Sequence, residues 1–184
     1  MYICGGAIPA LTGQRVKLRA MAAQDAAALY AVWCHPLVVP WLDAPPLASP
    51  EEAEELIRLL EQMSAVEESL RWSIAGPEGE VIGSCGYNNW QLQGAYRGEI
   101  GCELLPAYWG RGYMREALAL VLAFGFGTMG LNRIEGLCHP DNTRAGGLFR
   151  GLGFQREGLL REYRHTAAGF QDVDLYALLR SGQL

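Results

Sequence analysis

Hydrophobic residues recur along the chain with two spacings, and these spacings separate predicted strands from predicted helices. Alternation of apolar and polar residues predicts a first strand at 15–19, where Val16 and Leu18 share one face. Spacings of three and four residues predict a helix at 25–33 and a second helix that runs to about residue 66.

The start of the second helix is marked by its first residues. Ser49 is a favourable N-cap, Pro50 suits the first helical position, and Glu51 begins an acidic first turn. The proline-rich stretch 36–50 is therefore predicted to be a loop between the two helices.

Three segments with strand character follow, at 71–75, 81–88 and 97–105. The turn residues at 76–79 and around Gly94 separate them. Short turns join neighbouring strands in an antiparallel arrangement, so this run predicts a mostly antiparallel sheet.

The last third of the chain alternates helices and strands. Its predicted elements are a long apolar helix at 113–129, a strand at 133–138, a short helix from Asp141 or Asn142 to about Gly151, and closing strands at 154–164 and 171–179. The complete order is β, α, α, βββ, α, β, α, ββ, which predicts an α/β (α+β) protein with a mixed sheet covered by helices. No repeat or long linker divides the chain, so one domain over residues 1–184 is expected.

Composition and charge exclude several classes of function. Half of the 184 residues are apolar, which is enough for one sizeable core, and the net charge of −5 argues against nucleic-acid binding and against a polybasic membrane surface. No apolar run approaches the ~20 residues of a membrane span. Residues 1–12 carry no basic segment of the kind that begins a signal peptide, so a cytoplasmic location is expected.

The cysteines are scattered, odd in number and without metal-ligand spacing. They are Cys4, Cys34, Cys85, Cys102 and Cys138. We interpret them as reduced residues of the core or strands in a cytosolic protein, and we expect no metal site.

The segment 104–117 is the most informative one, because it joins a predicted strand to a predicted helix through Gly110 and Gly112. The first N–H groups of a helix have no helical partner, and the helix dipole adds partial positive charge there. Glycine lets such a backbone bend closely around an anion, which makes the segment a candidate phosphate cradle. The alternative is a helix start that needs glycine only for a tight turn.

Other phosphate-binding patterns fit this segment less well. A dinucleotide fingerprint requires a third glycine where the chain has Arg115, and Lys17, the single lysine, is far from any P-loop position.

The chain resembles the GNAT N-acetyltransferases from Val16 to Leu179. The stretches that carry the resemblance are Glu-Ile-Gly-Cys-Glu-Leu-Leu-Pro at 99–106, Tyr-Trp-Gly-Arg-Gly-Tyr-Met-Arg-Glu-Ala at 108–117, Arg-Ile-Glu at 133–135, His-Pro-Asp-Asn at 139–142, Leu-Gly-Phe at 152–154 and Glu-Gly at 157–158. In this combination they are most similar to the branch that acetylates ribosomal-protein N-termini.

The resemblance implies the fold and the cofactor site. The strand 99–105 is expected to carry a bulge and to splay from 133–138, and acetyl-CoA is the expected cofactor. Residues expected to bind its pantetheine arm and pyrophosphate are Cys102, Leu104, Leu105, Trp109, Gly110, Arg111, Gly112, Tyr113, Met114 and Asn142, with Phe149 near the thioester. Asn142 is alternatively an N-cap, and the two roles are compatible.

Two positions depart from the family pattern. Ala107 replaces a Gln or Arg at the start of the loop, which is a mild loss because backbone amides form most of the cradle. Ala145 and Phe149 stand where relatives place a Ser or Tyr that protonates the leaving thiolate. A thiolate with an intrinsic pKa of ~8.5 can leave without full protonation, so the general acid remains unassigned.

Attack of an amine on a thioester requires a base that removes a proton from nitrogen. Glu103 is the first candidate and Glu99 the second, because period-two spacing places both carboxylates on one face of the same strand. The alternative for Glu99 is an ion pair with Arg97 or Arg133. A backbone N–H of the splayed strand is expected to stabilise the oxyanion.

Several other residues are weaker candidates for a catalytic role or are interpreted as structural. Glu135, His139 and Glu116 are interpreted as structural, and His165 and Tyr163 as weak candidates for the base. The aromatic residues Trp33, His35, Trp41 and Trp90 are expected around the acceptor groove or at a dimer contact.

The sequence therefore predicts an N-acetyltransferase that moves the acetyl group of acetyl-CoA directly to a primary amine. The acceptor is a peptide N-terminus or a small molecule, and the resemblance allows a homodimer. The alternative is a non-catalytic module of the same fold that senses or binds acyl-CoA, which the residues at 145 and 149 keep open. A third reading, an unrelated nucleotide-binding α/β protein, is disfavoured because it needs a parallel sheet.

Overall fold

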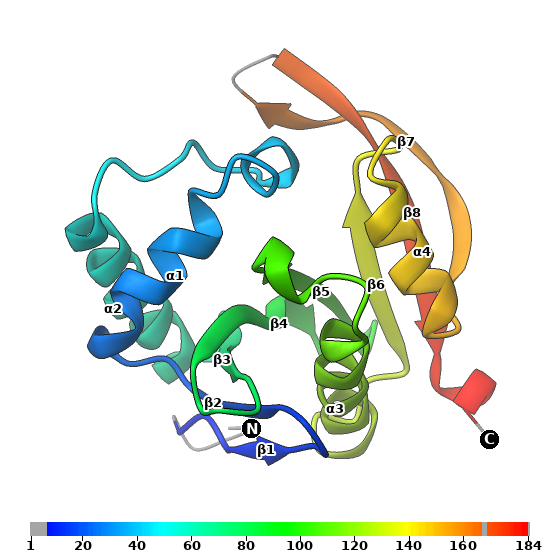
Figure 1. Cartoon of the computed structure of the whole chain (residues 1–184). Coiled ribbons are helices and arrows are strands. Elements are labelled where there is room, and N and C mark those ends of the chain that lie inside the picture. The colour runs from blue at the N-terminus through cyan, green and yellow to red at the C-terminus, as the bar shows by residue number, and fades with distance from the viewer. Residues whose placement is uncertain (1–6, 167–168, 184) are drawn as a thin grey trace.

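The chain folds around one sheet in a computed structural model that describes residues 7–166 and 169–183. The sheet has eight strands in the order β1-β2-β3-β4-β5-β6-β8-β7 (Figure 1). The predicted free thiol of Cys4 lies outside the described residues.

The strands are β1 (Leu11–Thr12), β2 (Lys17–Ala20), β3 (Leu70–Ala75), β4 (Val81–Gln91), β5 (Arg97–Leu104), β6 (Arg133–Cys138), β7 (Gln155–Thr166) and β8 (Gly169–Leu179). The helices are α1 (Ala26–Trp33), α2 (Pro50–Ala65), α3 (Tyr113–Gly127) and α4 (Thr143–Gly151), with short 3₁₀ turns η1 (Ala23–Asp25), η2 (Val39–Trp41), η3 (Pro106–Tyr108) and η4 (Arg180–Gln183).

The predicted mixed α/β order of elements is confirmed. The short strand β1 was not predicted, because two residues are too few to show a period. Ser49 caps α2 as predicted: its side chain accepts a hydrogen bond from the Glu52 N–H. The predicted loop between α1 and α2 contains the 3₁₀ turn η2.

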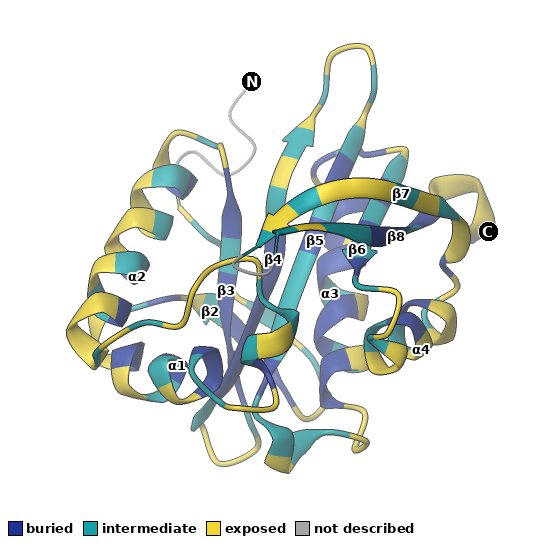
Figure 2. Cartoon of the chain, turned by 90° about the horizontal axis from the view of Figure 1, so that it is seen from above, coloured by how far each residue is buried: buried dark blue, intermediate teal, exposed yellow. Residues whose placement is uncertain are grey.

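Helices cover both faces of the sheet, with α1 and α2 on one face and α3 and α4 on the other (Figure 1). The larger core lies between α3 and the sheet and contains Trp72, Tyr87 and Leu118. The smaller core lies under α1 and α2 and contains Leu29 and Ile57. Figure 2 shows buried residues along β3, β4 and the inner side of α3.

Replacing Gly125 with Ala is expected to lower the free energy of unfolding by about 2 kcal/mol. A Cβ atom there would lie 1.8 Å from the hydroxyl oxygen of Tyr87. That buried hydroxyl donates a hydrogen bond to the Val121 carbonyl at 3.0 Å, so the ring must move or the bond is lost. Urea unfolding measures the change. Gly127→Ala is the control, since a Cβ at Gly127 meets nothing within 4 Å, and equal stability of both variants would contradict the prediction.

The predicted splay between β5 and β6 is confirmed. The two strands pair in parallel from Arg97↔Arg133 to Ile100↔Gly136. Beyond that point β5 continues to Leu104 without a partner on the β6 side. The sheet is therefore open between these strands at one end.

The bulge expected in β5 lies in β4 instead. Tyr87 pairs with Ile100 and Asn89 pairs with Glu99, so Asn88 is the extra residue. A bulge turns successive side chains toward one side of a strand. Both asparagine amides accordingly donate to the Glu99 carboxylate, at 3.1 and 3.3 Å.

Within the described residues, no helix combines the length and apolar character needed to cross a membrane. No group of His, Cys, Asp and Glu side chains in that part of the chain is arranged to hold a metal ion.

Candidate active site

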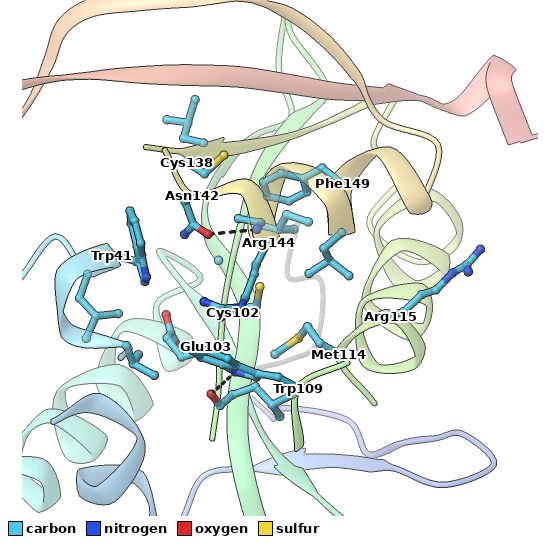
Figure 3. Close-up of a pocket in the computed structure, with 18 of the residues that line it drawn as sticks. Trp41, Cys102, Glu103, Trp109, Met114, Arg115, Cys138, Asn142, Arg144 and Phe149 are labelled. Carbon is cyan, nitrogen blue, oxygen red and sulfur yellow. Dashed lines mark hydrogen bonds between the residues drawn. The ribbon is translucent and has the colours of Figure 1, made fainter. Parts of the chain in front are cut away.

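A cavity of about 540 Å³ lies at the gap between β5 and β6. Its lining includes Cys102 and Leu104, which face α3, and Glu99 and Glu103, which face the α1–α2 side because side chains alternate along a strand. The cavity therefore reaches both faces of the sheet. Figure 3 shows Trp41 and Glu103 on the side of the α1–α2 segment, and Phe149 on α4.

The open edge of β5 has few free backbone groups. The N–H of Leu105 donates to the Ile82 carbonyl of β4 at 2.9 Å. By alternation, the backbone groups of Cys102 and Leu104 face the gap. The Leu104 carbonyl already accepts the indole N–H of Trp109 at 2.8 Å (Figure 3). The free groups are therefore the N–H and C=O of Cys102 and the N–H of Leu104.

The glycine loop takes the conformation that its sequence suggested. Gly110 and Gly112 have φ angles of 70° and 82°, in the left-handed region that favours glycine. The first bond back into α3 runs from the Glu116 N–H to the Gly112 carbonyl. The N–H groups of Tyr113 and Met114 consequently have no helical partner. Such groups at a helix start are able to bind an anion, and these two, at the edge of the cavity, are called the anion-binding turn below.

Most of the predicted cofactor-binding residues meet in this one cavity. Its lining includes Cys102, Leu104, Trp109, Gly110, Gly112, Tyr113, Met114, Asn142 and Phe149. The side chain of Leu105 packs against the smaller core instead. Arg111 is exposed, with its guanidinium over the rings of Tyr108 and Tyr113.

On the α4 side of the cavity, Ala145 and Phe149 stand where relatives place a Ser or Tyr, and neither side chain can donate a proton. Asn142 caps α4, since its Oδ1 accepts the Ala145 N–H at 3.1 Å. Phe149 is buried against Tyr176, with ring centroids 5.3 Å apart. Gly136 makes this possible, because a Cβ there would lie 2.4 Å from the Phe149 ring.

Glu103 is held in place by neighbouring strands. It forms an ion pair with Arg71 of β3, and the side chains are only 14% and 11% exposed. The Ser84 hydroxyl donates to the same Glu103 oxygen at 2.6 Å. Arg71 also donates to Asn88 at 2.9 Å. The charge of Glu103 is thus balanced within the sheet.

Glu99 lies in the same cavity in a different environment. Its described hydrogen bonds come from the neutral amides of Asn88 and Asn89. The arginines considered as its partners both pair with Glu135 instead, Arg97 at 3.1 Å and Arg133 at 2.6 Å. Among the described ion pairs, none neutralises Glu99.

The structural interpretation of Glu116 agrees with its contacts. Its carboxylate accepts the Arg15 backbone N–H at 2.7 Å and the Arg15 Nε–H at 3.0 Å. Burial acts to raise the pKa of Glu116, but the hydrogen bonds from Arg15 and Val16 outweigh it and hold the pKa below its usual value.

The remaining histidine and tyrosine candidates lie outside the cavity lining. His139 shares a hydrogen bond with Gln171 at 3.1 Å. His165 packs on the exposed Phe170, and Tyr163 is exposed.

Of the four aromatic residues expected near the acceptor, Trp41 lines the cavity. Trp33 is buried in the smaller core. Trp90 packs against the larger core, and His35 accepts the Leu37 N–H within a turn.

Sequence reasoning missed an ion pair in the lining of the cavity. Arg164 of β7 contacts Asp43 of the α1–α2 segment at 2.8 Å, and both line the cavity. The pKa of Asp43 is raised by burial, opposed by Arg164, and raised further by Glu99 and Glu103. No local pattern marks these residues, because the contact joins distant segments.

The cavity thiols are poor nucleophiles. Burial raises the pKa of Cys102 to about 12 and that of Cys138 to about 11. Both thiols are therefore protonated at neutral pH. The described cysteines are all free.

Comparison with known proteins agrees with this geometry. The family described as an acetyltransferase (GNAT) domain matches residues 15–155. The uncharacterised N-acetyltransferase p20 of Bacillus licheniformis is 35% identical over 168 residues, which cover 91% of this chain and 94% of that protein. The ribosomal protein uS5-alanine N-acetyltransferase of Escherichia coli (strain K12) is 30% identical over 102 residues, covering 55% of this chain and 52% of that protein.

A solved structure shares the fold. RimJ of Mycobacterium smegmatis, in complex with CoA-disulfide, superimposes with a TM-score of 0.89 at 23% identity, covering 97% of this chain and 90% of that chain. The splayed sheet, the glycine loop and the matches along the sequence lead to one conclusion. The chain belongs to the GNAT acetyltransferase family and is an N-acetyltransferase.

Proposed function

We propose that the protein transfers the acetyl group of acetyl-CoA to a primary amine by direct attack within a ternary complex. The observation that carries this proposal is the cavity at the β5–β6 gap, whose lining includes both the glycine loop and Glu99. The protonated state of Cys102 and Cys138 supports direct transfer over an acetyl-cysteine intermediate.

The residues present fit the cofactor. The N–H groups at Gly112, Tyr113 and Met114 would hold the pyrophosphate, and those of Cys102 and Leu104 would bind the pantetheine arm. When bound, acetyl-CoA supplies an activated thioester. A β5 N–H at the gap would stabilise the oxyanion formed on attack.

Glu99 is the base that we favour, ahead of Glu103. A base must be free to accept a proton, either from the acceptor ammonium before attack or from the amine nitrogen as it attacks the thioester. Glu103 would lose its ion pair with Arg71 on protonation, whereas Glu99 is held by amide donors alone. No side chain is assigned as general acid, so the thiolate would leave without one from Ala145 or Phe149.

The acceptor is proposed to be a primary amine on a peptide N-terminus or a small molecule. One relative is named for acetylating the alanine N-terminus of a ribosomal protein, and the match spans about half of each chain. A cytoplasmic location and a homodimer remain predictions.

Acetyl-CoA is expected to stabilise the protein against thermal unfolding by about 2.7 kcal/mol at a ligand concentration of ~100 times Kd. CoA is expected to act similarly, and ATP, added in parallel, is the control that should cause no shift. Absence of a shift with either CoA species would refute the proposed function.

The one observation that speaks for a non-catalytic alternative is the lack of a proton donor at Ala145 and Phe149. It is tested by release of CoA from acetyl-CoA in the presence of a panel of peptide and small-molecule amines. A thermal shift without CoA release for any amine would support a binding module.

A further inference from the structure

Arg15 reaches the glycine loop from the turn between β1 and β2, far away in the sequence. Its Nε–H and its backbone N–H both donate to the Glu116 carboxylate, at 3.0 and 2.7 Å. Its Nη1 donates to the Arg111 carbonyl at 2.9 Å. One side chain thus binds both the loop and the first turn of α3.

The same guanidinium also packs on the loop. It lies 4.9 Å from the centroid of the Tyr113 ring. A Cβ at Gly112 would be 3.1 Å from its Nη2 atom, so the glycine allows this close approach. The loop is therefore covered on the side that faces Arg15.

Holding the Arg111 carbonyl fixes the direction of the next N–H group. In a trans peptide the carbonyl oxygen and the following amide hydrogen point in opposite directions. Because Arg15 draws the Arg111 oxygen to its own side, the Gly112 N–H is turned away from Arg15. Gly112 lies between the large cavity and a second hollow that Arg15 itself lines, so an N–H turned away from Arg15 is directed to the side of the large cavity.

Arg15 also balances a charge that would oppose phosphate binding. Glu116 lies in the first turn of α3, beside the N–H groups of the anion-binding turn. An unpaired carboxylate there would repel a phosphate, and the ion pair with Arg15 offsets that repulsion.

We propose that Arg15 is a positioning residue for cofactor binding, which orients the Gly110–Gly112 loop and offsets the charge of Glu116. The proposal rests on the proposed function, since the ligand is the pyrophosphate of acetyl-CoA. It adds a residue from outside the loop, at the other end of the chain, to the cofactor site.

Calorimetric titration of Arg15→Gln with acetyl-CoA, dephospho-CoA and pantetheine tests the proposal. The Kd for acetyl-CoA and dephospho-CoA is expected to rise about tenfold in each case, because both carry the pyrophosphate. The Kd for pantetheine, which lacks it, should stay unchanged. Arg15→Lys keeps the charge but not the three-way contact. Its Kd for acetyl-CoA and dephospho-CoA should lie between the wild-type value and that of Arg15→Gln.

Arg58→Gln is the matched control. It removes the exposed Arg58–Glu54 ion pair on α2, remote from the loop, and should leave all three values unchanged. Thermal unfolding without ligand establishes that each variant is folded.

Three results would overturn the proposal. An unchanged Kd for dephospho-CoA would mean that Arg15 contacts the 3′-phosphate rather than positioning the loop. Equal losses for pantetheine would indicate general disruption of the site. Recovery of the wild-type Kd in the double variant Arg15→Gln/Glu116→Gln would show that Arg15 acts only by offsetting the charge of Glu116. That result would refute the orienting role. Failure of the wild-type protein to bind any of the CoA species would refute the proposed function instead.

Discussion

Glu99→Gln is expected to lower kcat by about 10²-fold or more while leaving the Kd for acetyl-CoA unchanged. Gln keeps the shape of the side chain, and its one carboxamide oxygen can still accept a hydrogen bond from Asn88 or Asn89, but it cannot take a proton. The loss is measured by CoA release at saturating amine and acetyl-CoA.

Glu103→Gln is the matched control on the same strand. It removes the partner of Arg71, whose side chain is only 11% exposed, so its main effect should be on stability rather than on kcat. A full kcat for Glu99→Gln together with a large loss for Glu103→Gln would reverse the assignment of the base.

Asp25→Ala is expected to lower the free energy of unfolding by about 3 kcal/mol. Asp25 is 3% exposed and accepts two hydrogen bonds from Arg19 at 2.7 Å, one from the Ser73 hydroxyl at 2.9 Å and one from the Ala22 N–H at 3.0 Å. These contacts tie the start of α1 to β2 and β3. Urea unfolding at neutral pH measures the loss.

The contribution of Asp25 should depend on pH. Burial acts to raise the pKa of Asp25, but the hydrogen bonds from Arg19, Ser73 and Ala22 lower it overall. A lowered folded-state pKa means that the stabilisation is fully present above the unfolded value of about 4 and is lost as the pH falls through the folded value. The difference in the free energy of unfolding between wild type and Asp25→Ala should therefore shrink in acid.

Glu54→Ala, in an exposed ion pair, is the control for Asp25→Ala and should change stability by less than about 0.5 kcal/mol. An equal loss in both variants would contradict the prediction.

Features encoded by neighbouring residues were predictable from the sequence. The caps Ser49 and Asn142 and the loop containing Gly110 and Gly112 depend on residues a few positions apart, and local backbone geometry dictates them. The splay of the sheet followed from family resemblance rather than from any local pattern.

Features that depend on strand register were not predictable in the same way. The pairing of Glu103 with Arg71 depends on the registers of β3, β4 and β5, which bring Arg71 level with Gly101, two residues from Glu103 on the same face. A shift of one residue would place the two side chains on opposite faces. The bulge at Asn88 has the same origin. Without it, the amides of Asn88 and Asn89 would face opposite sides and could not both bind Glu99.

The opening of the sheet between β5 and β6 separates two groups of residues, so that each group can change in evolution without the other. The glycine loop and the edge of β5 lie toward α3, while Trp41, Asp43 and Arg164 come from the α1–α2 segment and from β7. Under the proposed function, we expect substitutions in the latter group to redirect the enzyme to a new amine without disturbing the cofactor side. A scaffold of this kind can then acquire new acceptors while the part of the site that binds the thioester stays constant.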